Sequence, residues 1–373
     1  MEALYVHDLV CIDPPHHFPQ KQSLEWLRKS YIRYQKDQNR SEEDFEKIIS
    51  RVGVSESQIS NRNYYLPDFH LPPSEAEIFG EAAVEGVSKR QTQFAGFTNQ
   101  ILQKIYEQRK LPEHLIHVTC TGYGSPSAAQ LIAAEKSPTT VVTHSYHMGC
   151  YGVFPALRMA GGFLNSSSLF AQSSAVAPAV DIVHTELCSL HLNPLDPSLE
   201  QIVIQTLFSD GAAVYRMSTE KPAGPSFQLL HLGEFLLPNT SEAMHWSVSE
   251  GGMAMGLSKN VPGLIASSLK KTLEIWEFQT GLAILSQLKE AIVAVHPGGP
   301  KIIDLVKQSL ELKEVQVAAS RKVLYERGNM SSATIPHVWA EILRDSNSAG
   351  KLVLSMAFGP GLTLAMSLMR VVE

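Results

Sequence analysis

Three side chains of this sequence have the chemical types that acyl transfer requires, and they lie in three short segments. Cys150 lies in YHMGCYGV (residues 146–153), His296 begins HPGGP (296–300), and Asn329 lies in GNMSSA (328–333). A free thiol is only a few per cent ionised at neutral pH, so a catalytic cysteine needs a positive neighbour or a helix N-terminus. His296 could be that neighbour, and the Asn329 amide could donate to an oxyanion or an enolate. Together they predict acyl transfer with formation of a carbon–carbon bond.

Each of these residues taken singly has an ordinary explanation. A buried cysteine is usually a small hydrophobic residue, and a histidine before Pro-Gly-Gly is often a turn residue. The segments are separated by more than 140 and by about 30 residues. This spacing favours a constellation that is assembled in space and not along the chain.

Further motifs extend the pattern towards the C-terminus. They are MGC (148–150), LFSDGAA (207–213), VPG (261–263), HPGGP (296–300), GNMSS (328–332) and FGPGL (358–362). In these strings and their order, the chain resembles the type III polyketide synthases, the chalcone-synthase-like branch of the thiolase superfamily. Before residue 70 the resemblance is weaker, although ISNR (59–62), with Tyr64 and Tyr65 after it, stands where the family has a comparable loop.

The resemblance implies an enzyme that condenses an acyl thioester starter with malonyl-CoA. Cys150 would carry the acyl group, and His296 and Asn329 would share the carbonyl oxygen of the malonyl thioester, so that loss of carbon dioxide leaves a stabilised enolate. The product would be a pyrone or phenolic polyketide. Coenzyme A thioesters would be substrates and no cofactor would be bound permanently. The family also implies a homodimer.

Several residues are expected to contact substrate because of the resemblance. Phe208 matches an aromatic gatekeeper between the cofactor tunnel and the cavity, and Met255 stands where the plant enzymes have a second gatekeeper Phe. The other expected contacts are Cys188 and His191 at the elongation cavity, Cys120 at the starter pocket, and Phe358, Gly359 and Pro360 as a wall. Phe208 could instead be a core residue before a tight Asp-Gly turn, and Met255 could fill a core gap.

Coenzyme A contacts are expected at Arg51, Gly298 and Gly299. The family's basic loop reads RVGVSES (51–57) here, with an acid where a second base is expected, so Arg51 and Arg62 remain as candidate bases. A phosphopantetheine arm needs fewer basic contacts, which leaves an acyl carrier protein open as a partner.

Two other functions stay open at this stage. One is an enzyme similar to ketoacyl synthase III that performs a single condensation and joins two acyl chains. The other is an inactive homologue that acts as a binding subunit, because a fold does not guarantee a function. The presence of Cys150, His296 and Asn329 together argues against the inactive homologue.

The elements that would position these residues alternate between strands and helices. Strands are predicted at 114–120, 139–144, 183–186, 292–295 and, as the closing strand, 352–358; helices are predicted at 127–135, 151–159 and 301–311. The helix that begins after Cys150 would direct its positive end at the sulfur, beside an imidazolium at His296. The resemblance implies a thiolase-like, duplicated αβαβα five-layered core. Its halves would be residues 1–222, with the cysteine, and 223–373, with the histidine and asparagine.

Composition limits the remaining possibilities. The chain has 373 residues, of which 44% are hydrophobic and 18% charged, which is typical of a well-packed globular protein. Its net charge of -6 and lack of a Lys/Arg run argue against a nucleic-acid partner. Four cysteines without CxxC spacing fit reduced thiols and imply no metal site. The first residues have neither a basic nor an apolar signal region, so we expect a cytoplasmic protein without a membrane span.

Two segments carry less information. Residues 20–62 hold much of the charge, and LEWL (24–27) has helical spacing, so a solvated helical face is predicted there. Residues 165–180 are small and polar and are expected to form a loop that is longer than in the plant enzymes.

Overall fold

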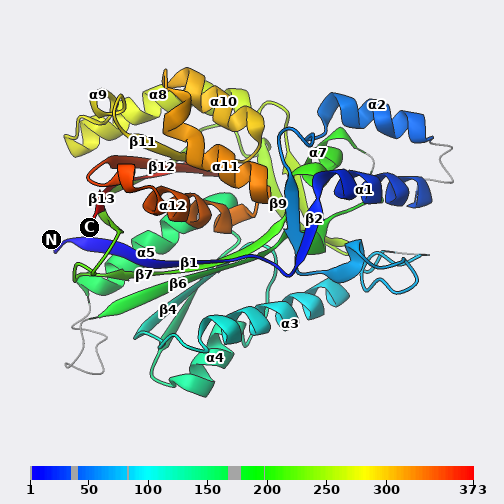
Figure 1. The fold of residues 1–373 in the computed structure, drawn as a ribbon, viewed down its shortest axis with the longest axis horizontal. Coiled ribbons are helices and arrows are strands. Elements are labelled where there is room, and N and C mark those ends of the chain that lie inside the picture. Colours follow the sequence, from blue (N-terminus) through cyan, green and yellow to red (C-terminus); the bar gives the residue numbers. More distant parts are fainter. Residues whose placement is uncertain (1, 35–40, 82–83, 167–177, 197) are drawn as a thin grey trace.

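The computed structural model describes residues 2–34, 41–81, 84–166, 178–196 and 198–373. Most of the predicted 165–180 loop, residues 167–177, therefore lies outside the described part. Figure 1 shows the arrangement of the helices and strands. The helices are α1 (Gln20–Tyr34), α2 (Glu42–Val52), α3 (Val87–Ile105), α4 (Ala128–Lys136), α5 (Val153–Asn165), α7 (Leu199–Leu207), α8 (Val261–Thr280), α9 (Ile284–Gln287), α10 (Pro300–Ser309), α11 (Ala318–Arg327) and α12 (Thr334–Arg344).

The strands of the described residues form one large sheet and two small ones. The large sheet contains β1 (Leu4–Ile12), β4 (His114–Thr119), β5 (Val141–Tyr146), β6 (Ala179–Leu187), β7 (Asp210–Ser218), β8 (Ser226–Leu236), β11 (Ile292–Val295), β12 (Leu352–Gly359) and β13 (Thr363–Val372). The small sheets pair β2 (His16–Pro19) with β3 (Asn61–Tyr64) and β9 (Met244–Ser249) with β10 (Gly252–Leu257).

The large sheet has the order β11-β12-β13-β8-β1-β7-β6-β4-β5 and contains the same pairing pattern twice. From β1, the pairs β1–β7 and β7–β6 are antiparallel and β6–β4 is parallel. From β8, the pairs β8–β13 and β13–β12 are antiparallel and β12–β11 is parallel. Only the start of β1 pairs with β8, and this short contact joins the halves. The division at residues 222 and 223 falls in the loop between β7 and β8 and stays a prediction.

Five layers follow from which face each side chain covers. Figure 1 shows α5 and α12 between the two halves of the sheet, α8, α9 and α10 above, and α3 and α4 below. In β4, Ile116 packs with α5 and α12, whereas its neighbour Leu115 packs with α3 and α4. In β12, Val353 faces the middle layer and Leu354 the outer helices, as expected for strands buried on both faces. The expected duplicated αβαβα core is thus confirmed.

Local sequence explains where the predicted elements begin. Ser127 is the N-cap of α4: its hydroxyl accepts from Gln130 N (3.2 Å), and the Gln130 side chain accepts from Ser127 N (2.9 Å). The strand predicted at 292–295 matches β11, and the strand at 352–358 matches β12 to within a residue. However, β12 does not close the chain, because the apolar run of β13 follows it and pairs with it in antiparallel.

The helix predicted at 151–159 begins later and ends later than expected. A short 3-10 helix, η3 (Gly149–Tyr151), contains Cys150, and α5 then runs to Asn165. The glycines near its end do not break it, because Gly161 packs directly on the sheet: a Cβ there would lie 3.4 Å from Leu4 Cδ1.

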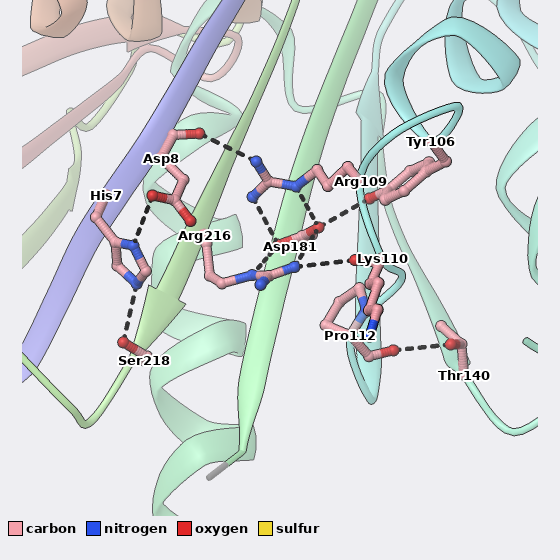
Figure 2. A network of polar contacts seen from close by, with 10 residues as sticks. All are labelled: His7, Asp8, Tyr106, Arg109, Lys110, Pro112, Thr140, Asp181, Arg216 and Ser218. Carbon is pink, nitrogen blue, oxygen red and sulfur yellow. Dashed lines mark hydrogen bonds and ion pairs between the residues drawn. The ribbon is translucent and has the colours of Figure 1, made fainter. Parts of the chain in front are cut away.

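A buried carboxylate fixes the outer end of the N-terminal half of the sheet. Figure 2 shows Asp181 of β6 between Arg109 and Arg216. Arg216 Nε donates to Asp181 Oδ1 (2.7 Å), Arg109 Nε donates to Asp181 Oδ2 (2.9 Å), and Tyr106 OH donates to the same Oδ2 (3.2 Å). Arg109 also donates to the carbonyl of Asp8 in β1. This Asp181 cluster ties β1, β6, β7 and the end of α3 together.

Candidate active site

The turn that contains Cys150 (residues 148–150) depends on a glycine, Gly149, that no other residue could replace without strain. Gly149 has φ +69°, and a Cβ there would lie 3.0 Å from Pro360 Cδ. This close approach places Cys150 in η3 directly before α5, with 7% of its surface exposed. Backbone N–H groups at such a helix start favour negative charge on the sulfur.

His296 directly follows β11, and its backbone is fixed by the neighbouring strand. His296 N donates to Met356 O (2.8 Å) and its carbonyl accepts from Gly298 N (2.8 Å). The side chain is 1% exposed, and neither ring nitrogen has a hydrogen-bond partner among the described residues. Buried imidazole nitrogens normally have hydrogen-bond partners, and His296 departs from this pattern.

Asn329 is held so that its amide NH2 group remains available. Its backbone bonds to Leu207 O (3.1 Å) and accepts from Ser209 N (2.9 Å), forming an isolated bridge with Phe208. Its Oδ1 accepts from Ser331 N (2.9 Å), which turns the donating end of the amide elsewhere. That end faces Cys150, where burial raises the pKa of the thiol and a hydrogen bond from Asn329 partly opposes the rise. The structure therefore brings these two predicted residues together.

Cys150 lines a pocket that is partly open to solvent. It is lined by six of the residues that the sequence analysis expected at substrate, besides Cys150 itself: Cys120, Cys188, His191, Phe208, Met255 and Pro360. Phe358 and Gly359 do not line it. Phe358 is 3% exposed in the core that contains α8 and α10, and a Cβ on Gly359 would lie 2.1 Å from the Tyr151 ring. Both residues therefore pack around the turn that contains Cys150, outside the pocket.

Burial has the largest effect on the pKa values of Cys150 and His296, the two groups that were expected to be charged. It raises the pKa of the Cys150 thiol to about 12, against hydrogen bonds from Ser331 and Asn329, and it lowers the pKa of His296 to about 3. At neutral pH both groups are therefore neutral. The expected imidazolium at His296 is thus not supported in the protein without substrate, since the dry surroundings disfavour each charge.

The three expected coenzyme A contacts lie in two separate segments, and one further candidate base, Arg62, is excluded. Arg51 is exposed in the last turn of α2. Gly298 and Gly299 form the turn between His296 and α10, where Gly299 has φ +145°. Arg62, however, is 2% exposed and donates to Gln20 Oε1 (2.8 Å) and to Phe208 O (3.1 Å). It holds the backbone at Phe208 in place and, being buried, cannot reach a cofactor phosphate.

One alternative for Phe208 was a core residue before a tight Asp-Gly turn. The prediction of a turn is wrong, because Asp210 and Gly211 lie in a strand. Asp210 begins β7 and is buried, and its carboxylate accepts from Tyr65 N (2.8 Å), Ser189 N (2.7 Å) and Ser189 Oγ (2.7 Å). A carboxylate with partners on both sides fits within a sheet, so the Asp-Gly pair does not need a turn.

Four residues of the site were not predicted from the sequence. Ser331 Oγ lies 3.1 Å from Cys120 Sγ and 3.7 Å from Cys150 Sγ, and Thr121 and Trp246 line the pocket. Trp246 Nε1 donates to Cys120 O (2.8 Å). Glu186 lies behind Cys120 and Thr121. Ser331 could have been found from its place in GNMSS, whereas Glu186, on a buried strand, carries no signal in sequence.

Among the described residues there is no group of three or more His, Cys, Asp or Glu side chains placed to hold a metal ion. Within the same part of the chain, no helix has the length and apolar character needed to cross a membrane.

Comparison with known proteins identifies the fold of the whole chain and a family model that matches part of it. Residues 228–373 match the C-terminal domain of chalcone and stilbene synthases. The C-terminal type III polyketide synthase domain of Steely1 from Dictyostelium has a TM-score of 0.84 at 22% identity, with all of both chains covered. For 1,3,6,8-tetrahydroxynaphthalene synthase from Streptomyces coelicolor the values are 0.82 and 21%, with 99% of both chains covered. PKS-I from the brown alga Ectocarpus siliculosus gives 0.82 and 20%, with 99% of this chain and 98% of that chain covered. Residues 228–373 thus match the C-terminal domain of the chalcone and stilbene synthase family, and the whole chain has the same fold as the solved type III polyketide synthases.

Proposed function

We propose that this protein is a type III polyketide synthase that extends an acyl thioester with malonyl-CoA and releases a pyrone or phenolic ring. The observation that carries the proposal is Cys150 at the start of α5, hydrogen-bonded by Asn329 and opening into a pocket. Such a pocket can hold an acyl chain on the sulfur while a second thioester enters beside it.

In this proposal Cys150 attacks the starter thioester after passing its proton to His296. The transfer converts a neutral pair into an ion pair without changing the net charge, and the two opposite charges then stabilise each other in low dielectric. The His296 ring nitrogens are unpartnered, so they can accept this proton and later contact the malonyl carbonyl. Loss of carbon dioxide leaves an enolate held by His296 and Asn329, and its carbon attacks the acyl group on Cys150.

The test is product mass spectrometry with a series of acyl-CoA starters and malonyl-CoA, using Cys150→Ala as the control. Products with two or more added malonyl units support an iterative synthase. A single condensation with every starter would instead favour the enzyme similar to ketoacyl synthase III. Trp246 and His191 line the pocket with bulky side chains, which limit the length of the chain that it can hold. The number of extensions is therefore the decisive measurement.

Delivery of the substrate as a coenzyme A thioester is part of the proposal. Arg51 is exposed and positively charged, so Arg51→Ala should raise KM for acyl-CoA more than for the matching acyl-pantetheine, which lacks the nucleotide. An equal rise with both substrates would remove Arg51 from phosphate binding and would leave delivery by an acyl carrier protein as the alternative.

We also propose a homodimer that pairs through β5. This strand is the last in the sheet order, so one of its edges carries free backbone donors and acceptors. Val141 of β5 is 39% exposed, and Tyr123, 63% exposed, makes an edge contact with Tyr146. Light scattering of the wild type and of Thr143→Pro should show a dimer and a monomer, respectively, because proline removes a strand donor.

A further inference from the structure

A second cavity lies outside the pocket at Cys150 and shares no lining residue with it. Its volume is about 520 Å³, and it is partly open to solvent. It lies between α3 and the segment that joins β1 to β2 (Figure 1). This α3 groove is lined by one face of α3, by the segments 12–16 and 65–67, and by Glu77. Its size is within the range of small-molecule sites.

One wall of the α3 groove is a row of side chains along α3. The row consists of Gln93, Phe97, Gln100 and Lys104. These residues recur at intervals of three or four, so they are neighbours on one side of the helix. Another side of α3 packs on the sheet, where Phe94 and Leu102 are buried. The helix is thus held in place without this row, which stays available for a ligand.

The facing walls are fixed by contacts that do not involve α3. Arg327 Nε donates to Asp13 Oδ1 (2.9 Å), which holds the segment after β1. The buried Asp68 carboxylate accepts from Glu77 N (3.0 Å) and Ile78 N (2.7 Å), which holds the segment that carries Glu77. The α3 groove is therefore preformed, as is usual for small-molecule sites.

Aromatic and proline side chains give the α3 groove a flat apolar surface. The rings of Tyr65 and Phe97 have centroids 6.1 Å apart and an interplanar angle of 38°. Phe97 is only half-buried, so part of its ring is free to contact a ligand. Pro15 and Pro67 extend the apolar surface. Rings attract one another at separations of about 4.5–7 Å, so this surface favours a planar aromatic ligand.

The charges around the α3 groove leave one cation without compensation. The Asp13 carboxylate is neutralised by its ion pair, and Glu77 pairs with Lys89 (2.7 Å), which does not line the groove. Burial lowers the pKa of His16, so its ring adds no charge at neutral pH. Lys104 is exposed and has no ion pair or hydrogen bond among the described residues. The apolar surface thus lies beside a free positive charge.

We propose that the α3 groove binds a planar aromatic acid, whose ring lies against Phe97 and Tyr65 and whose carboxylate pairs with Lys104. The ring and the charge match different parts of the groove, so an aliphatic acid or a neutral aromatic compound uses only one of them. The Gln100 amide can donate to or accept from a polar group at the edge of the ring. This binding does not depend on the proposed condensation, because the groove and the pocket at Cys150 have no residue in common.

Isothermal titration calorimetry of the protein with 2-naphthoate tests this site. A dissociation constant of about 1 mM or below is expected for an acid of this size. The neutral 2-naphthamide has the same rings but cannot form the ion pair, so it should bind about threefold more weakly. Absence of 2-naphthoate binding, or equal binding of the acid and the amide, would overturn the proposal.

Substitutions on α3 locate the bound compound. Lys104→Gln should weaken 2-naphthoate binding about threefold and leave 2-naphthamide binding unchanged, because only the ion pair is lost. Phe97→Ala should weaken the binding of both compounds about tenfold, because the ring contact is lost. Lys271→Gln is the matched control: it removes an exposed lysine from α8 and should change neither affinity. Thermal unfolding followed by circular dichroism checks that each variant is folded.

Reversal of the charge gives a further readout. In Lys104→Glu, 2-naphthylmethylamine should bind more tightly than 2-naphthoate, the opposite of the order in the wild type. Unchanged affinities in Lys104→Gln and Phe97→Ala would refute the proposal, because the acid would then bind elsewhere, such as in the pocket at Cys150. A preference of the wild type for the amine would also refute it, since the carboxylates of Asp13 and Glu77 would then determine the charge of the groove.

Discussion

The protonation state of Cys150 is the residue-scale property on which the proposed acyl loading depends. The sulfur lies at a helix start, yet it is buried, and the effect of burial on its pKa is larger than that of its hydrogen bonds. With its pKa raised by burial, the Cys150 sulfur is a thiol at neutral pH, and the proposed attack requires a proton acceptor. This arrangement protects a reactive sulfur from unwanted oxidation, because the thiolate is the reactive form.

The pH dependence of alkylation tests this state. With a pKa of about 12, the thiolate fraction of Cys150 is far below saturation at neutral pH, so its iodoacetamide rate should rise about tenfold per pH unit from 7 to 9. Mass spectrometry of the labelled peptide measures this rate, with Cys150→Ala as the blank. A rate that is already at its plateau at pH 7 would show instead that Cys150 and His296 form an ion pair in the resting protein.

Asn329 should matter in one half-reaction more than in the other. Asn329→Ala should slow release of carbon dioxide from malonyl-CoA by about 10²–10³, because one donor to the developing enolate is lost. Loading of Cys150, followed by intact mass, should fall less, since the amide makes only one of several contacts to the sulfur. Equal losses in both reactions would contradict this division of roles.

At the scale of elements, the β9–β10 hairpin brings side chains to the pocket from a segment with little sequence signal. Met255 and Trp246 are directly opposite each other across the two strands, and both line the pocket. Trp246 is fixed by its bond to Cys120 O and by an edge contact with His191, whereas Met255 has a flexible side chain. Met255 is therefore the adjustable part of this wall.

Substitution at Met255 should shift product size. Met255→Phe should favour shorter products and Met255→Gly bulkier starters, by ratios that correspond to about 1–3 kcal/mol per methylene. Product ratios from a mixture of starters measure the change. Ala254→Phe is the control, since it adds the same ring to the exposed face of the same strand. Identical profiles for both Met255 variants and the control would mean that Met255 fills a core gap away from substrate.

At the scale of the whole molecule, the Asp181 cluster joins parts of the N-terminal half that are distant in sequence. Its carboxylate is fully buried and is held by two guanidinium groups, Arg109 and Arg216, which are themselves partly exposed (Figure 2). Removing one member leaves buried charge without compensation, which costs far more than the loss of a surface pair.

Asp181→Ala should lower the free energy of unfolding by about 3–5 kcal/mol, because both arginines lose their partner. Urea unfolding followed by circular dichroism measures this loss. Asp304→Ala, which removes an exposed pair with Arg321, should cost about 1 kcal/mol or less. A similar small loss for both variants would show that the Asp181 cluster does not hold the N-terminal half together.

The chemical types of the site residues and most of the regular core could be predicted from the sequence. Motifs such as HPGGP and GNMSS mark Cys150, His296 and Asn329 because glycine, proline and small residues are needed where the chain turns tightly beside a reacting group. Strands such as β11 were predictable because they are buried on both faces and so read as continuous apolar runs.

Which of these residues lie close together, and which of them are charged, could be learned only from the tertiary structure. Arg62, a candidate for coenzyme A, is buried against the backbone of Phe208, and Glu186 and Trp246 reach the site from strands whose local sequence does not mark them. The neutral state of Cys150 and His296 was also beyond the sequence, since a pKa depends on solvent exclusion and on neighbours brought in from other strands and helices. Local spacing determines conformation over a few residues, whereas burial and long-range contacts are properties of the assembled layers.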